Sequence, residues 1–209
     1  MGVFLKVCGI TSCADALAVA ECGADAIGLM FYEPSPRNLG LDQASKIARE
    51  VGDRVQKVGV FVNAEAGFVK EAVTACQLDV AQFHGDESPE YCGQFTIPVW
   101  KAFRIRDAAS LDALADYNTR AWLLDSYVKG QPGGTGERFN WDLAVEATRM
   151  GRPVVLAGGL NQQNTADAVS EVRPFGLDVS SGVESAPGRK DIDKVKAFVK
   201  AARSASGDG

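Results

Sequence analysis

Short runs of consecutive apolar residues alternate with longer stretches of helical periodicity along the whole chain. The apolar runs are rich in Val, Ile, Leu and Phe and lack polar alternation, which is typical of strands covered on both faces of a parallel sheet. Eight strands are therefore expected, at 4–8, 25–31, 57–62, 79–84, 98–103, 121–125, 153–159 and 176–182.

Amphipathic helices are expected between these runs. Residues 66–77 place Phe68, Ala72 and Cys76 on one side of a helix and Lys70 and Glu71 on the other. Similar patterns occupy 41–51, 107–117, 140–150, 161–172 and 191–202. Units of roughly 20–30 residues have the size of a strand-plus-helix repeat. Eight of them predict a single-domain (β/α)8 (TIM) barrel over 1–209, with a doubly wound sheet as the alternative and a disordered tail at 204–209.

Composition narrows the possible functions. The chain is 46% hydrophobic and 23% charged, with a net charge of -5 and a pI of about 5.0. No basic stripe is present to bind nucleic acid, and no apolar run is long enough to span a membrane. The N-terminus does not resemble a secretory signal, so a cytoplasmic location is expected. Five cysteines without paired spacing and a single histidine predict neither a disulfide scaffold nor a metal site.

In a barrel of this kind the chemistry lies at the carboxyl ends of the strands, in the loops that lead into the helices. Two of these loops are long, at 32–40 and 126–139. The first delivers Arg37, whose planar guanidinium suits a carboxylate, and the second has the glycine-rich composition of a mobile lid. The alternatives are a surface arginine and a plain connecting loop.

Glycine and serine follow the seventh and eighth expected strands. Gly158 and Gly159 precede a helix expected to begin near Asn161, and Ser180, Ser181 and Gly182 end the eighth strand. Exposed backbone amides at such turns bind phosphate, and barrels often place a phosphate site at these two loops. The five glycine and serine residues are therefore candidate phosphate ligands, with simple tight turns as the alternative.

A thiol and a carboxyl end two strands that lie apart in the barrel. Cys8 ends the first strand and Asp125 the sixth, so a base and an acid are expected to face each other across the barrel mouth. Lys6, two residues before Cys8, should point to the same side and favour the thiolate. A buried, purely structural cysteine and a loop-capping aspartate are the alternatives.

Two further polar residues end strands. His84 could orient a substrate, or could only hydrogen-bond the Gly85–Asp86 turn. Asp178 could support the site electrostatically, or could cap the turn at Ser180.

Seven motifs in order carry a resemblance to a known family. They are "KVCGIT", "GLMF…PSPR", "VGVFVN", "QFHGDE", "LLDS…GGTGERFNW", "LAGGL" and "DVSSGVE". Together they resemble phosphoribosylanthranilate isomerase, over nearly the entire chain. Phe83, where Leu is expected, and Asn140, where Asp is expected, are small departures.

The resemblance implies an Amadori rearrangement of phosphoribosylanthranilate in tryptophan biosynthesis. It implies Asp125 as general acid, Cys8 as general base, Arg37 as the ligand of the anthranilate carboxylate, and backbone at Gly158–Gly159 and Ser180–Gly182 as the phosphate grip. No metal or organic cofactor is implied, since the imine of the substrate is itself the electron sink. The partner is then a small molecule, and monomer and homodimer both stay open.

Two alternative functions are kept. One is another phosphate-binding barrel, such as indoleglycerol-phosphate synthase or ribulose-phosphate epimerase. The synthase would need a catalytic set of lysine and glutamate. The epimerase would need metal-binding histidines, and His84 is the one histidine of the chain. The other alternative is a non-catalytic barrel that only binds a phospholigand. The joint presence of Cys8, Asp125 and Arg37 argues against it.

Overall fold

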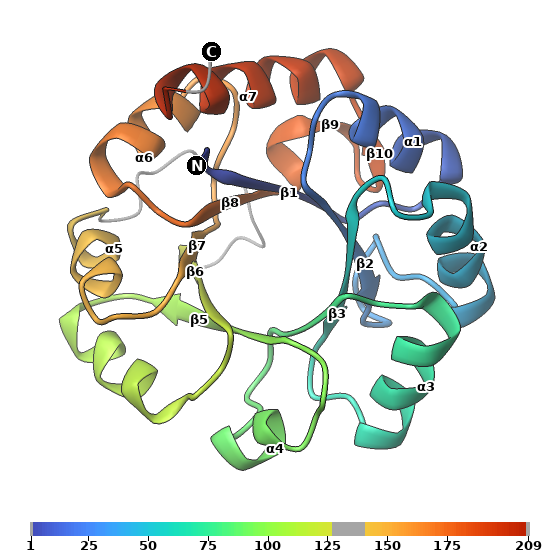
Figure 1. Cartoon of the computed structure of the whole chain (residues 1–209), viewed down its shortest axis with the longest axis horizontal. Coiled ribbons are helices and arrows are strands. Elements are labelled where there is room, and N and C mark those ends of the chain that lie inside the picture. The colour runs from blue at the N-terminus through green and yellow to red at the C-terminus, as the bar shows by residue number, and fades with distance from the viewer. Residues whose placement is uncertain (1, 127–140, 208–209) are drawn as a thin grey trace.

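A closed barrel of eight parallel strands forms the centre of the molecule, and helices surround it (Figure 1). The computed structural model describes residues 2–126 and 141–207. Each strand pairs with the next in the sequence, and β1 pairs with β8 to close the barrel. The strands are β1 (Phe4–Cys8), β2 (Ala26–Phe31), β3 (Gln56–Phe61), β4 (Val80–Phe83), β5 (Val99–Ile105), β6 (Ala121–Ser126), β7 (Val154–Leu156) and β8 (Gly176–Val179). The predicted (β/α)8 barrel is confirmed.

The last two strands are shorter than predicted. β7 ends at Leu156 rather than at residue 159, because Gly158 and Gly159 have φ angles of 80° and 65°, outside the β region. β8 ends at Val179, where Ser180 turns the chain out of the sheet. The glycine and serine turns therefore begin immediately at the mouth of the barrel.

Helices follow most strands, and two of them differ from expectation. The α-helices are α1 (Cys13–Glu21), α2 (Leu41–Val51), α3 (Ala66–Cys76), α4 (Pro89–Gly93), α5 (Trp141–Thr148), α6 (Thr165–Val172) and α7 (Ile192–Ala205), with 3₁₀ helices η1 (Ala108–Asp116) and η2 (Ser181–Val183). In η1, the buried Leu111 and Leu114 are three residues apart, which matches the three-residue turn of a 3₁₀ helix.

The helix expected near Asn161 begins four residues later, at Thr165. The side chain of Asn161 accepts a hydrogen bond from the amide of Gln163 at 2.9 Å, and Asn164 accepts one from the amide of Asn161 at 2.9 Å. These local bonds compete with the helical pattern and hold 161–164 as a turn.

Alternate residues of each strand pack into two separate cores. On β1, Leu5 and Val7 point outward and join the layer between the barrel and the helices, while Cys8 belongs to the core inside the barrel. On β6, Leu123 is likewise inside and Leu124 outside. This two-sided burial explains why the strands read as continuous apolar runs. It also fixes which strand-end side chains face the mouth.

The end of the chain is more ordered than the sequence suggests. A short antiparallel pair, β9 (Glu184–Ala186) and β10 (Arg189–Lys190), precedes α7. Ser204 and Ala205, assigned above to a disordered tail, belong to α7, and this expectation is corrected. Ala202 is fully buried and Ala205 packs against the core, so the apolar stripe of the helix continues past residue 203. In Figure 1, α7 lies beside α1 and completes the helical ring.

Candidate active site

Cys8 and Asp125 both lie at carboxyl ends of barrel strands and both face inward. Cys8 is the last residue of β1 and belongs to the core inside the barrel. Asp125 follows the inward-facing Ala121 and Leu123 at two-residue steps along β6, so its side chain faces the mouth. The structure thus places the predicted base and acid at the same end of the barrel.

The thiol of Cys8 occupies a space that its neighbours leave open. Gly28 on β2 stands in register with Cys8, and a side-chain carbon at Gly28 would lie 2.6 Å from the sulfur. Lys6, one step below on the inner face, is fully buried and donates to both carboxylate oxygens of Asp178 at 2.9 Å. The thiol therefore stands above a buried ion pair, and its own position is set by packing against backbone.

Burial raises the pKa of the Cys8 thiol above its usual value, and this outweighs the opposing charges of Lys6 and Lys190. Lys6 lowers the pKa of Cys8, which is the direction that the sequence predicted. The net shift is nevertheless upward, so the expected preference for the thiolate is not found in the free protein. A thiol held neutral here needs a cation or a bound substrate to reach its reactive form.

His84 contacts Asp125 rather than the turn that follows it. Its Nε2 lies 3.2 Å from Oδ2 of Asp125, and its Nδ1 lies 3.2 Å from the side-chain amide nitrogen of the buried Gln82. With the Gln82 amide donating to Nδ1, the ring proton sits on Nε2 and is donated to Asp125.

The turn after His84 is held by other groups. The Gly85 amide bonds to the Glu87 carboxylate at 2.9 Å, and the Asp86 amide bonds to the side chain of Asn63. Of the two roles considered for His84, the contact geometry fits the one at the mouth.

The carboxylate of Asp178 accepts from Lys6 at 2.9 Å, and among the described residues it accepts no hydrogen bond from the Ser180–Ser181 turn. These contacts therefore do not support the alternative in which Asp178 caps the turn at Ser180.

Arg37 reaches over the end of β1 to a carboxylate from the last loop. Its side chain passes so close to Gly9 that a side-chain carbon there would lie 2.4 Å from its Cδ. Nε and Nη2 donate to the two oxygens of Glu184 at 2.8 and 2.5 Å. Lys190 donates to the same carboxylate at 2.8 Å. Glu184 thus bridges two cations.

Charge is balanced within this cluster. Burial by itself raises the pKa of Glu184, but the hydrogen bonds from Arg37 and Lys190 outweigh it and hold the pKa below its usual range. Burial lowers the pKa of Lys190 despite the opposing effect of Glu184. A guanidinium carries five N–H groups, so three of those on Arg37 stay available beside Glu184.

The loops after β7 and β8 pack directly on each other. A side-chain carbon at Gly182 would lie 1.9 Å from the carbonyl oxygen of Leu160, so only glycine fits there. Among the described residues, no hydrogen bond from the amides of Gly158, Gly159, Ser181 or Gly182 is found. Two loops in contact thus carry backbone N–H groups without a partner among the described residues, and such groups can bind oxyanions.

Several expectations bear on the rest of the chain. Within the described ranges, no group of three or more His, Cys, Asp or Glu side chains is arranged to hold a metal. All five cysteines are free thiols. No helix in the described part of the chain is long and apolar enough to cross a membrane. The lid expected at 126–139 lies outside the described residues except for Ser126.

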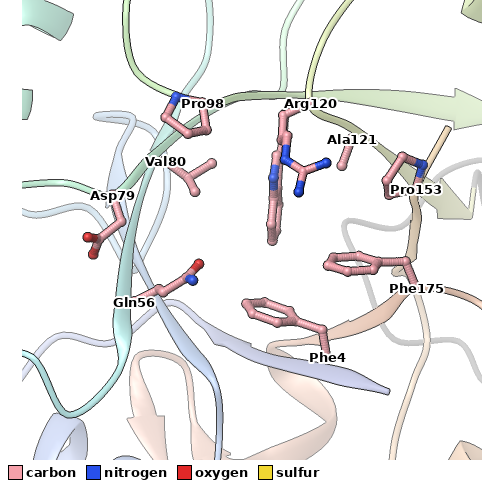
Figure 2. Close-up of a pocket in the computed structure, with 10 residues that line it drawn as sticks. Phe4, Gln56, Asp79, Val80, Pro98, Arg120, Ala121, Pro153 and Phe175 are labelled. Carbon is pink, nitrogen blue, oxygen red and sulfur yellow. The ribbon is translucent and has the colours of Figure 1, made fainter. Parts of the chain in front are cut away.

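A cavity of about 260 Å³ opens at the opposite end of the barrel (Figure 2). The first residues of β1 and β6, Phe4 and Ala121, line it together with Arg120 and Phe175. Four residue steps of extended strand lead from Phe4 to Cys8, a distance of about 13 Å. The cavity is therefore distinct from the mouth that holds Cys8 and Asp125.

The fold and the mouth define a (β/α)8 barrel that carries a thiol and a carboxyl at the carboxyl ends of two of its strands. Residues 5–201 match the family model of N-(5'-phosphoribosyl)anthranilate (PRA) isomerase. The chain belongs to this family.

Similar proteins agree in sequence and in structure. An N-(5'-phosphoribosyl)anthranilate isomerase of Citrifermentans bemidjiense is 54% identical over 95% of this chain and 96% of its own. The crystal structure of phosphoribosyl anthranilate isomerase from Thermotoga maritima superposes with a TM-score of 0.92 at 40% identity, covering 97% of this chain and 99% of that one. A phosphoribosyl anthranilate isomerase in complex with reduced 1-(o-carboxyphenylamino)-1-deoxyribulose 5-phosphate superposes with a TM-score of 0.88 at 38% identity, with 97% and 99% coverage.

Sequence reasoning missed three side chains that organise the mouth, namely Gln82, Glu184 and Lys190. Gln82 could have been found from the two-residue step that separates it from His84 on one strand face. Glu184 and Lys190 lie six residues apart and bond to each other, but their other partners come from the loop after β2 and from the residue after β8, which the local sequence does not indicate.

Proposed function

We propose that this chain catalyses the Amadori rearrangement of N-(5'-phosphoribosyl)anthranilate to 1-(2-carboxyphenylamino)-1-deoxyribulose 5-phosphate, a step of tryptophan biosynthesis. The observation that carries the proposal is the placement of Cys8 and Asp125 at the ends of β1 and β6, facing inward at one mouth. Membership of the isomerase family supports it. The solved relative with a reduced ketose phosphate bound supports the same substrate class.

Asp125 is the general acid of the first step. In its protonated form it gives its proton to the furanose ring oxygen, the bond between that oxygen and C1 breaks, and the nitrogen lone pair forms the imine. His84, bonded to Oδ2 of Asp125 at 3.2 Å, fixes the carboxyl so that the other oxygen can face the sugar.

Cys8 is the general base of the second step. Its thiolate removes the proton from C2, and the electrons of that C–H bond flow into the imine to give an enolamine. The enolamine then takes a proton at C1 and loses the hydroxyl proton at C2, which yields the ketone. Since burial disfavours the thiolate of the free protein, we expect the protonated imine to help ionise the thiol in the complex.

The two anionic ends of the substrate are held apart. Backbone amides at Gly158–Gly159 and Ser180–Gly182 bind the phosphate, and the unpaired N–H groups of these loops support this role. Arg37 binds the anthranilate carboxylate with the edge that Glu184 leaves open. Asp178 supports the site from below through Lys6.

A fluorescence time course with phosphoribosylanthranilate generated in situ tests the proposal. Wild type should consume the fluorescent substrate, while Cys8→Ala and Asp125→Asn should each lose a factor of roughly 10² or more in turnover with the fold retained. Cys13→Ala is a matched control, because Cys13 lies five residues further on at the start of α1 and is given no role. Full activity in Cys8→Ala would show that the base is another group, and an inactive wild type would leave a barrel for a different sugar phosphate.

We also propose that residues 1–209 act as one barrel domain in the cytoplasm, without a nucleic-acid or membrane partner, as a monomer or homodimer. The net charge of -5 supports the proposal that no nucleic acid or membrane surface is a partner. The Thermotoga maritima relative is described as dimeric, which supports the homodimer.

A further inference from the structure

Arg104 stands beside the proposed acid at the mouth of the barrel. On β5 it is in register with Asp125 on β6. Trp100 and Ala102, at two-residue steps before it, belong to the core inside the barrel. By the alternation of the strand, the Arg104 side chain therefore points to the same inner face as Asp125.

The guanidinium of Arg104 has no partner within the described part of the chain. The residue is exposed, and it makes no hydrogen bond or ion pair through its side chain anywhere in 2–126 or 141–207. Arg37 differs, since two of its donors are already committed to the buried Glu184. Arg104 thus presents the full set of guanidinium donors at the mouth.

In the ring of strands, β5 lies two positions from β7 and three from β8, whose loops form the proposed phosphate grip. The loops of that grip follow β7 and β8, and Cys8 and Asp125 flank it from β1 and β6. The sugar must lie between these two residues, so the aryl group extends toward β2–β5. On those four strands, Arg104 is the one Lys or Arg among the described residues that faces inward at a carboxyl end.

We propose that Arg104 binds the ring carboxylate of the substrate and so positions the aryl end against the phosphate end. This rests on the proposed function. A planar guanidinium matches a carboxylate through two parallel N–H···O bonds. Arg104 supplies a second cationic contact beside that of Arg37, and it selects substrates that carry the carboxylate.

Binding of two ligands to wild type and three variants tests this assignment. The ligands are reduced 1-(o-carboxyphenylamino)-1-deoxyribulose 5-phosphate and its phenylamino counterpart without the carboxylate. Arg104→Met should weaken binding of the first on the order of ten- to a hundredfold and change binding of the second by less than about twofold. Arg104→Lys should recover part of the loss, because it keeps the charge but not the planar fork. Arg120→Met is the matched control, as Arg120 lines the cavity at the opposite end of the barrel.

Two outcomes would overturn the proposal. If binding of both ligands weakens equally, Arg104 contacts the phosphate or only maintains the shape of the mouth. If binding of both is unchanged, the Arg104 side chain contacts solvent and not the ligand. Turnover by wild type is measured in parallel. If wild type neither binds the carboxylated ligand nor consumes phosphoribosylanthranilate, the proposed function itself fails, whatever Arg104 does.

Discussion

The ammonium of Lys6 donates to both carboxylate oxygens of Asp178 at 2.9 Å inside the barrel, directly below Cys8. The two residues are 172 positions apart in the sequence and meet because β1 pairs with β8, with Lys6 in register with Asp178. Burial by itself lowers the pKa of Lys6, but the charge of Asp178 outweighs it and raises the pKa above its usual value. The pair closes the barrel and also sets the charge beneath the thiol.

Breaking this pair on one side should destabilise the protein strongly. Lys6→Met leaves the Asp178 carboxylate buried without its cation, and we expect a loss of about 3–5 kcal/mol in the free energy of unfolding. Urea denaturation monitored by circular dichroism measures it. The double variant Lys6→Met/Asp178→Leu should recover much of that loss, because no buried charge is left unpaired. A double variant as unstable as the sum of both single variants would contradict this account.

The pH dependence of the reaction should report the thiol of Cys8. A pKa raised by burial leaves less thiolate at a given pH, so kcat/KM of the free enzyme should still rise with pH above about 8.5, the ordinary thiol value. Asp178 adds to the raised pKa, so Asp178→Asn should move the rise to lower pH. The pH profile of kcat/KM and the rate of Cys8 alkylation by iodoacetamide measure both shifts. A pH profile without a thiol-like ionisation would contradict the assignment of Cys8 as the general base.

Much of the barrel and part of its mouth could be predicted from the sequence. Strand β1 is predicted by its apolar run, and the shared face of Lys6 and Cys8 follows from the two-residue period of a strand. The partner of Lys6 does not, because it depends on closure of the barrel and on the β1–β8 register. The same reason hid Glu184, whose bonds to Arg37 span 147 positions. Distant pairings of charged groups are properties of the assembled fold.

Glu184 should control substrate affinity through Arg37. Glu184→Gln removes the negative charge that holds Nε and Nη2 of Arg37. The cations Arg37 and Lys190 then lie near each other without a neutralising carboxylate. We expect KM to rise on the order of tenfold with kcat much less affected, since charged hydrogen bonds are worth roughly 1.5–3 kcal/mol. Steady-state kinetics measure the two parameters. Glu71→Gln, an exposed substitution on α3, is the matched control, and a fall in kcat alone would mean that Glu184 acts on the chemistry instead.

Buried thiols away from the mouth should make the fold sensitive to alkali. Burial raises the pKa of Cys76 to about 11, above the ordinary value of about 8.5 for an exposed thiol. Between these values the unfolded chain is ionised while the folded one is not, so stability is full below about pH 8.5 and falls as pH rises toward the folded pKa.

Cys76→Ala should therefore flatten the decline in unfolding free energy by about 1.4 kcal/mol per pH unit within that window. Urea titrations from pH 7 to 11 measure the slope. Cys92, whose pKa is also raised by burial to about 11, should contribute in the same way. An unchanged slope in both alanine variants would mean that other groups cause the alkaline loss.

Gly182 should be essential to the proposed phosphate grip because no side chain fits between the two loops. In Gly182→Ala the new methyl group would lie 1.9 Å from the carbonyl oxygen of Leu160, which is backbone and cannot swing away. The loops after β7 and β8 must then separate, which would displace the backbone N–H groups proposed to bind the phosphate. We expect KM to rise at least tenfold and inhibition by inorganic phosphate to weaken in parallel, because both ligands use the same amides. Gly67→Ala, on the open surface of α3, adds the same methyl group without a clash and should change neither quantity. If Gly182→Ala raises KM but leaves phosphate inhibition intact, the phosphate is held elsewhere and the two loops serve only to pack the mouth.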